Sequence, residues 1–133
     1  MKNQAKIIVL WGIILIGLII HALIEMMPLF FGQSIAMPDA TGTMPDQMAW
    51  MMLLFFLLPM VCIVGVLFCS SNWIKITNLL LAALFMLLNL VHFISDGLIA
   101  GSALQSVLLI FVLFSSVLLF IASLRWKKET TTK

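Results

Sequence analysis

Charged side chains are scarce in this sequence. Seven Lys and Arg and five Asp and Glu make up 9% of the chain, whereas 64% of its residues are hydrophobic and its mean hydropathy is +1.25. A soluble domain carries about 25% charged and about 45–50% apolar residues. The composition therefore excludes a soluble domain and predicts an integral membrane protein.

The chain also lacks room for a soluble catalytic domain. One transmembrane helix uses about 20 residues, so four of them would take up most of the 133 residues. We therefore expect a single transmembrane domain, 1–133, which contacts the lipid bilayer and has no nucleic-acid partner. Because no activated nucleophile or known catalytic motif is present, an enzyme is the least supported class.

Cysteine is rare as well. Cys62 and Cys69 lie seven residues apart in one apolar segment, and a helix would separate them by about 10 Å along its axis. That distance is too long for a disulfide bond between them. We interpret both as small apolar residues.

Four long apolar segments remain once the polar stretches are set aside. They predict membrane spans at about 7–28, 48–69, 74–94 and 103–124. The first span opens like a signal peptide, but its apolar run exceeds the about 7–15 residues of a signal-peptide core, so we expect it to stay uncleaved. The predicted fold class is an all-α integral membrane protein, a four-transmembrane-helix up-down bundle.

The predicted loops differ in length. The first, 32–47, is rich in Pro and Gly and repeats Met-Pro-Asp at 37–39 and 44–46, which is typical of a turn-rich loop. Asp46 is placed to cap the second span. A short Ser95-Asp96-Gly97 exit and a Gly101-Ser102 break are expected between the third and fourth spans.

Basic residues are missing from the first and third predicted loops. In a four-span arrangement all of them fall on the other side of the membrane: Lys2, Lys6, Lys75, Arg125, Lys127, Lys128 and Lys133. Because positive loops stay on the cytoplasmic side, the pattern predicts that both termini are cytoplasmic. We expect a bacterial-type cytoplasmic membrane.

The two histidines of the chain share one pattern. His21 is followed four residues later by Glu25, and His92 is followed four residues later by Asp96. Four residues is about one helical turn, so each pair shares a helix face. Helices one and three of an up-down bundle are diagonal neighbours facing a common interior. The sequence therefore predicts that His21, Glu25, His92 and Asp96 form a polar cluster in the outer half of the bundle.

Other residues could support this cluster. Asn89 lies on the face of His92 and Asp96. Gln105, with Ser102 and Ser106, begins the fourth span at the depth of the two acids, where it could hydrogen-bond the metal-binding groups, although polar residues at a helix entrance need no such role. Gly17, one turn before His21, gives room for close helix approach.

Four interpretations of the cluster compete. The polar groups could pin the helices by hydrogen bonds, which are worth about 0.6–2 kcal/mol each in membranes. They could bind a divalent metal ion, since imidazole and carboxylate suit zinc, iron or manganese. They could form a path for protons or solutes. Bis-histidine haem is the fourth, and it is disfavoured because Glu25 and Asp96 would repel the propionates.

Methionine suggests a separate site or surface. Seven of the ten methionines fall between residues 26 and 52, on the predicted outer side. Thioethers select Cu(I), but methionine is also an adaptable contact residue. The sequence thus favours a small membrane protein that binds or passes a ligand, proton or metal ion at the cluster. The alternative is a structural or accessory subunit that contacts another membrane protein or a second copy.

Overall fold

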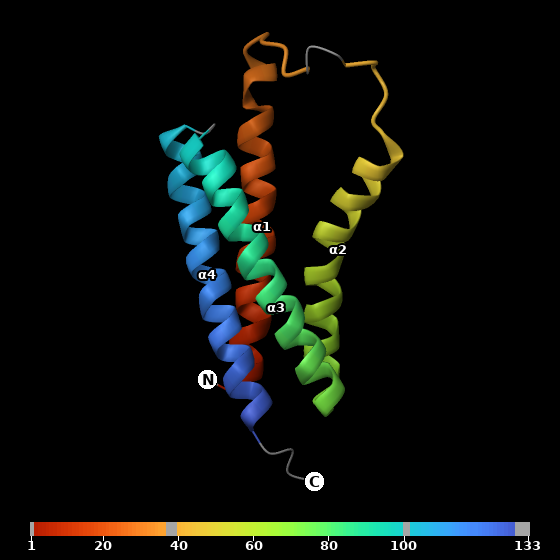
Figure 1. Cartoon of the computed structure of the whole chain (residues 1–133), viewed down its shortest axis with the longest axis vertical. Coiled ribbons are helices and arrows are strands. Elements are labelled where there is room, and N and C mark those ends of the chain that lie inside the picture. Colours follow the sequence, from red (N-terminus) through yellow and green to blue (C-terminus); the bar gives the residue numbers. More distant parts are fainter. Residues whose placement is uncertain (1, 37–39, 100–101, 130–133) are drawn as a thin grey trace.

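Four long helices make up the protein. The computed structural model describes residues 2–36, 40–99 and 102–129. In it, α1 covers Asn3–Phe30, α2 Asp46–Phe68, α3 Asn72–His92 and α4 Ala103–Lys128 (Figure 1). A π-helix, η1, covers Phe93–Ile99 and continues α3. Each of the four spans is long and apolar enough to cross a membrane. The predicted all-α four-helix membrane bundle is confirmed.

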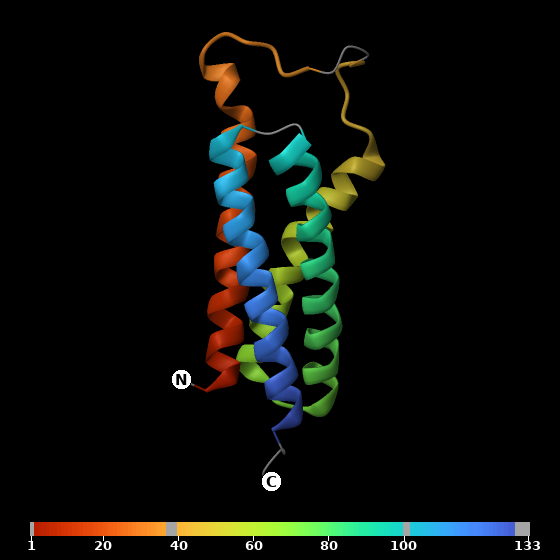
Figure 2. The same ribbon diagram turned by 60° about the vertical axis from the view of Figure 1, so that its left-hand side comes forward.

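The helix α4 is the packing partner shared by α1 and α3. These two helices lie diagonally, as predicted, and each packs along α4. The helix α2 packs mainly on α1 and diverges from the other three toward the end opposite the termini (Figures 1 and 2). The three better packed helices therefore form the body of the molecule.

An aromatic group fills the centre of the bundle. The rings of Trp11 and Phe85 meet edge to face at 5.1 Å, and Phe55 stacks on Phe85 at 5.2 Å. Such pairs add about 0.5–1.5 kcal/mol beyond the area they bury. The buried core consists of Ile7, Trp11, Ile14, Leu18, Cys62, Val66, Ala82, Phe85, Val112, Leu119, Ala122 and Trp126.

Buried amides join α3 to α4. Asn78 donates to Ser123 Oγ at 2.8 Å and accepts the Trp11 indole N–H at 2.8 Å. Nearer the other end, Asn89 donates to Ser116 Oγ at 2.7 Å. Each bond is worth about 0.6–2 kcal/mol in a bilayer, where water does not compete. Together they fix the register of α3 on α4.

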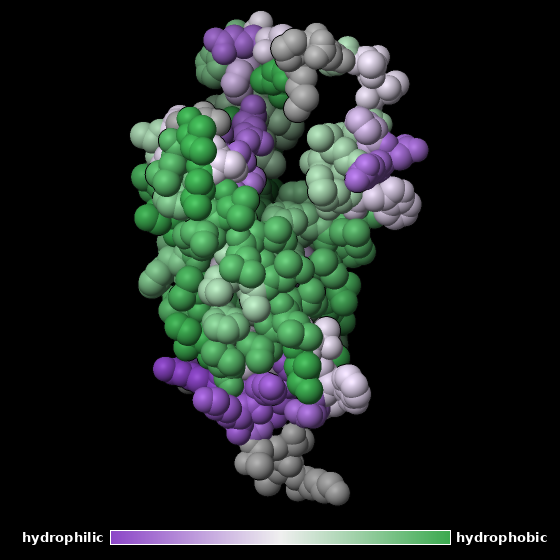
Figure 3. Space-filling view, in the orientation of Figure 1, coloured by the Kyte–Doolittle hydropathy of each residue, from purple (hydrophilic) through white to green (hydrophobic). Residues whose placement is uncertain are grey.

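One end of the bundle carries all the basic side chains of the described residues. The helices α1 and α3 begin there and α4 ends there, so the described ends of the chain lie close together (Figure 1). Figure 3 shows a hydrophilic band at this end below an apolar surface. Lys75 is buried in it, donating to the Glu129 backbone oxygen at 2.8 Å and lying 5.7 Å from the Trp126 ring. We call this the basic end; Lys133 lies outside the described residues.

Two local predictions are wrong. Pro45, not Asp46, takes the position before the first turn of α2, and no side chain caps that turn, so Asp46 contributes only its charge. Ser95, Asp96 and Gly97 form part of η1 instead of an exit loop. At this depth a helical backbone satisfies its own polar groups.

Met37, Pro38, Asp39 and Gly101 lie outside the described residues, and Cys62 and Cys69 are free, as expected.

The helices α1 and α4 approach each other closely at Gly17. A Cβ atom placed there would lie 2.5 Å from Val112 Cγ2 on α4. Any larger side chain would push the two helices apart or displace Val112. The close approach predicted for Gly17 is confirmed. It fixes the position of the next turn of α1 relative to α4.

Replacing Gly17 should destabilise the bundle. We expect Gly17→Ala to lower the free energy of unfolding by about 1–3 kcal/mol, the usual cost of overpacking. Gly12→Ala is the matched control, because a Cβ at Gly12 would have nothing within 4 Å and alanine favours the helix. Thermal unfolding in detergent, followed by circular dichroism, measures both. Equal stability of the two variants would contradict the assigned α1–α4 contact.

Candidate metal centre

His21 projects from α1 into the bundle. It lies one turn beyond Gly17, where α1 packs closely on α4, and only 4% of it is exposed. Neither of its ring nitrogens, Nδ1 and Nε2, has a hydrogen-bond partner among the described residues. Burial removes water from the ring, which is costly, and Nε2 faces the Glu25 carboxylate oxygen at 3.3 Å instead.

His92 and Asp96 come from the junction of α3 and η1. His92 ends α3, Asp96 lies in the first turn of η1, and His92 Nδ1 is 3.1 Å from Asp96 Oδ2. The other nitrogen of His92, Nε2, is buried without a hydrogen-bond partner. The structure thus presents one imidazole nitrogen and one carboxylate oxygen side by side.

Local packing holds η1 in place. A Cβ on Gly97 would lie 2.9 Å from Phe93 Cδ2, so a larger residue there would have to displace the Phe93 ring. Ser106 on α4 donates to the Gly97 backbone oxygen. A π-helix often marks a functional position in an otherwise regular helix. Here it keeps Asp96 directed at the two histidines while α4 anchors its backbone.

The two histidine pairs converge as predicted. The His21 and His92 rings meet edge to face with centroids 4.7 Å apart, and His21 Nε2 is 4.0 Å from Asp96 Oδ2. One ligand atom from each of His21, His92 and Asp96 lies within 4.8 Å of the others. Residues about 70 positions apart in the sequence therefore form one group, which we call the His-His-Asp group.

Glu25 lies at the edge of this group. Its Oε1 is 3.3 Å from His21 Nε2, and half of its side chain is exposed. It contacts His21 but is outside the set of three residues that share one centre. The structure therefore joins three of the four predicted residues directly and the fourth through His21.

The two residues predicted to support the cluster, Asn89 and Gln105, differ in their contacts. Asn89 is buried and bonded to Ser116, and its Oδ1 has no hydrogen-bond partner in the described part of the chain. Gln105 Oε1 accepts the Ser102 backbone N–H at 2.9 Å in a capping box at the start of α4. Gln105 thus caps a helix in this structure. Ser106, named above with Gln105, donates to the Gly97 backbone oxygen, whereas the contact made by Ser116 had no sequence signal because it is an ordinary serine in an apolar segment.

The haem alternative loses support from the geometry. The histidine rings are in direct contact, which leaves no space between them for a porphyrin. The methionines that could bind Cu(I) lie on α1 and α2 and in the segment between them, and the described ones are largely exposed: Met26, Met27, Met44, Met48, Met51 and Met52. Met37 lies outside the described residues.

The His-His-Asp group offers two nitrogen ligands and one oxygen ligand in an apolar setting. All Lys and Arg side chains of residues 2–129 that the structure describes lie at the opposite end, so no lysine or arginine neutralises Asp96 or Glu25.

Comparison of the chain with protein-family models, curated proteins and solved structures gave no match.

Proposed function

We propose that this protein binds a divalent transition-metal ion, represented by Zn²⁺, through His21, His92 and Asp96. The observation that carries the proposal is their convergence within 4.8 Å from two separate helices. Imidazole nitrogen and carboxylate oxygen are the ligands that zinc, iron and manganese accept. Glu25 is the candidate for a fourth ligand.

The distances are close to those that a metal ion requires. Zinc bonds of about 2.0–2.1 Å in a tetrahedral site separate the ligand atoms by about 3.4 Å. The observed separations are 3.1 Å for His92–Asp96, 3.3 Å for His21–Glu25 and 4.0 Å for His21–Asp96. The ligand atoms of His21, His92 and Asp96 lie within 4.8 Å of one another, so they would move closer together to share one ion. The ion would also neutralise carboxylates that lack a basic partner.

The competing role is a purely structural contact between helices. Asn78 illustrates such a contact, because both its amide nitrogen and its amide oxygen are hydrogen-bonded. Among the described residues, the buried His21 Nε2 has no hydrogen-bond partner, and it faces carboxylate oxygens of Glu25 and Asp96 at 3.3 and 4.0 Å. An ion bound between them would occupy this nitrogen, so the comparison favours a ligand.

Zinc should stabilise the protein by linking α1 to α3. At free Zn²⁺ about 100 times its dissociation constant, we expect about 2.7 kcal/mol of added stability and one ion per chain. His21→Ala and Asp96→Asn should each weaken binding by at least about 10–100-fold. The matched control, Asp46→Asn, removes an acid outside the group and should bind normally. Calorimetric titration of chelator-treated protein measures the affinity, and equal affinity in all variants would contradict the site.

Glu25→Gln tests the fourth position. The amide keeps the shape of the carboxylate, so we expect the free energy of unfolding of the metal-free protein to stay unchanged. We expect the affinity for zinc to fall. Stability and zinc content of the purified variant are measured on the same sample. If both equal those of the unsubstituted protein, Glu25 has no part in binding, and a solvent ligand completes the site.

We further propose that the basic end faces the cytoplasm of a bacterial-type cytoplasmic membrane. The support is the placement of all described basic residues at that end, to which positive-inside sorting applies. Reporter fusions after residue 40 and after Lys133 should then report opposite sides, with the terminal fusion cytoplasmic. The reverse assignment would overturn the orientation, and equal assignments would overturn the span count.

A further inference from the structure

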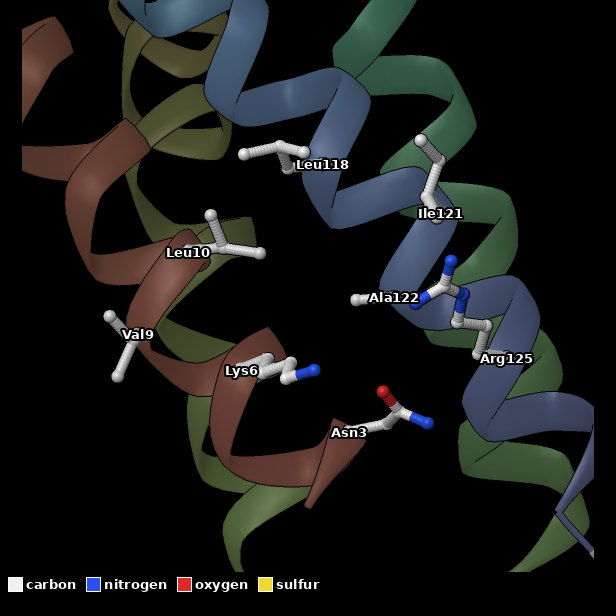
Figure 4. A pocket seen from close by; sticks show the side chains of 8 residues that line it. All are labelled: Asn3, Lys6, Val9, Leu10, Leu118, Ile121, Ala122 and Arg125. Atoms are coloured by element: carbon white, nitrogen blue, oxygen red, sulfur yellow. The ribbon is translucent and has the colours of Figure 1, made fainter. Parts of the chain in front are cut away.

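A cavity opens between α1 and α4 at the basic end of the bundle. Its volume is about 420 Å³, and it lies at the opposite end from the metal centre. Its polar rim consists of Asn3, Lys6 and Arg125 (Figure 4). Its apolar wall includes Val9, Leu10 and Leu118. The cavity therefore has a charged mouth and a hydrocarbon-like interior.

The two cations at the mouth come from opposite helices. Figure 4 shows Lys6 extending from α1 and Arg125 from α4 toward the space between the helices. Within the described residues neither forms an ion pair, and the nearby Glu129 carboxylate accepts a hydrogen bond from Asn3 at 2.6 Å. Ammonium and guanidinium groups on either side of one opening suit a phosphate group.

The apolar wall indicates that this phosphate belongs to a lipid. From Arg125 the lining continues to Leu118, seven residues or about 10 Å along α4. A soluble anion would gain nothing from this surface, whereas an acyl chain would cover it. Basic pockets between transmembrane helices are a recognised form of anionic-lipid site.

We propose that this cavity binds one anionic phospholipid of the leaflet at the basic end. Its phosphate lies between Lys6 and Arg125, and the first part of an acyl chain lies against Val9, Leu10 and Leu118. The lipid would fill the gap between the first turns of α1 and the last turns of α4. This site does not depend on the metal centre, because the two share no residue.

Native mass spectrometry of the detergent-purified full chain tests the site. Phosphatidylglycerol should bind at one molecule per chain and about 10- to 30-fold more tightly than phosphatidylcholine with the same acyl chains. Lys6→Gln combined with Arg125→Gln should remove that preference, because each basic residue near a bilayer contributes about fivefold. Lys127→Gln combined with Lys128→Gln is the control, since it removes the same charge from outside the cavity.

The outcomes separate a built site from general attraction. If both double variants lose the preference equally, bulk charge explains binding and the proposal is overturned. Displacement of the lipid by millimolar inorganic phosphate would overturn it as well, because the site would then be a simple anion site. Leu118→Trp fills the cavity without changing charge and should weaken phosphatidylglycerol binding at least about fivefold. Unchanged lipid affinity in this variant would contradict the acyl-chain groove.

Discussion

The structure depends on close contact between apolar helices that water does not drive together. In hydrocarbon, helices associate through tight packing and through hydrogen bonds that lipid cannot replace. The helix α4 supplies both: Val112 meets Gly17 of α1, and Ser116 and Ser123 accept hydrogen bonds from asparagines of α3. Since α1 and α3 are diagonal, α4 determines where their side chains meet.

This arrangement explains the position of the metal centre. His21 follows the Gly17 contact by one turn, and His92 follows the Asn89–Ser116 hydrogen bond by about one turn. Both contacts are made with the same stretch of α4, so both histidines lie at the same level along the bundle axis. The π-helix then adds Asp96, and Ser106 donates a hydrogen bond to the backbone oxygen of the next residue, Gly97. The group is therefore preorganised by contacts that it does not itself make.

Much of this could be predicted from the sequence, for identifiable reasons. Hydropathy determined the four spans, and the four-residue spacing placed each carboxylate beside its histidine. The shared depth of His21 and His92 followed from their similar distance along two parallel spans. The π-helix could not be predicted, because Ser95-Asp96-Gly97 has the composition of a turn. The hydrogen bonds of Ser116 and Ser106 depend on how helices rotate against each other, which single-segment patterns do not encode. The capping role of Gln105 is local, and the Ser102-x-x-Gln105 spacing is the sequence signature of a capping box.

The central claim is that imidazole from two helices binds one metal ion. X-ray absorption at the zinc edge of the zinc-loaded protein reports the ligand atoms directly. The account predicts two imidazole nitrogens and carboxylate oxygen at about 2.0–2.1 Å from the ion. Zinc bound through sulfur at about 2.3 Å, from Cys62 or Cys69, or through oxygen alone, would contradict it.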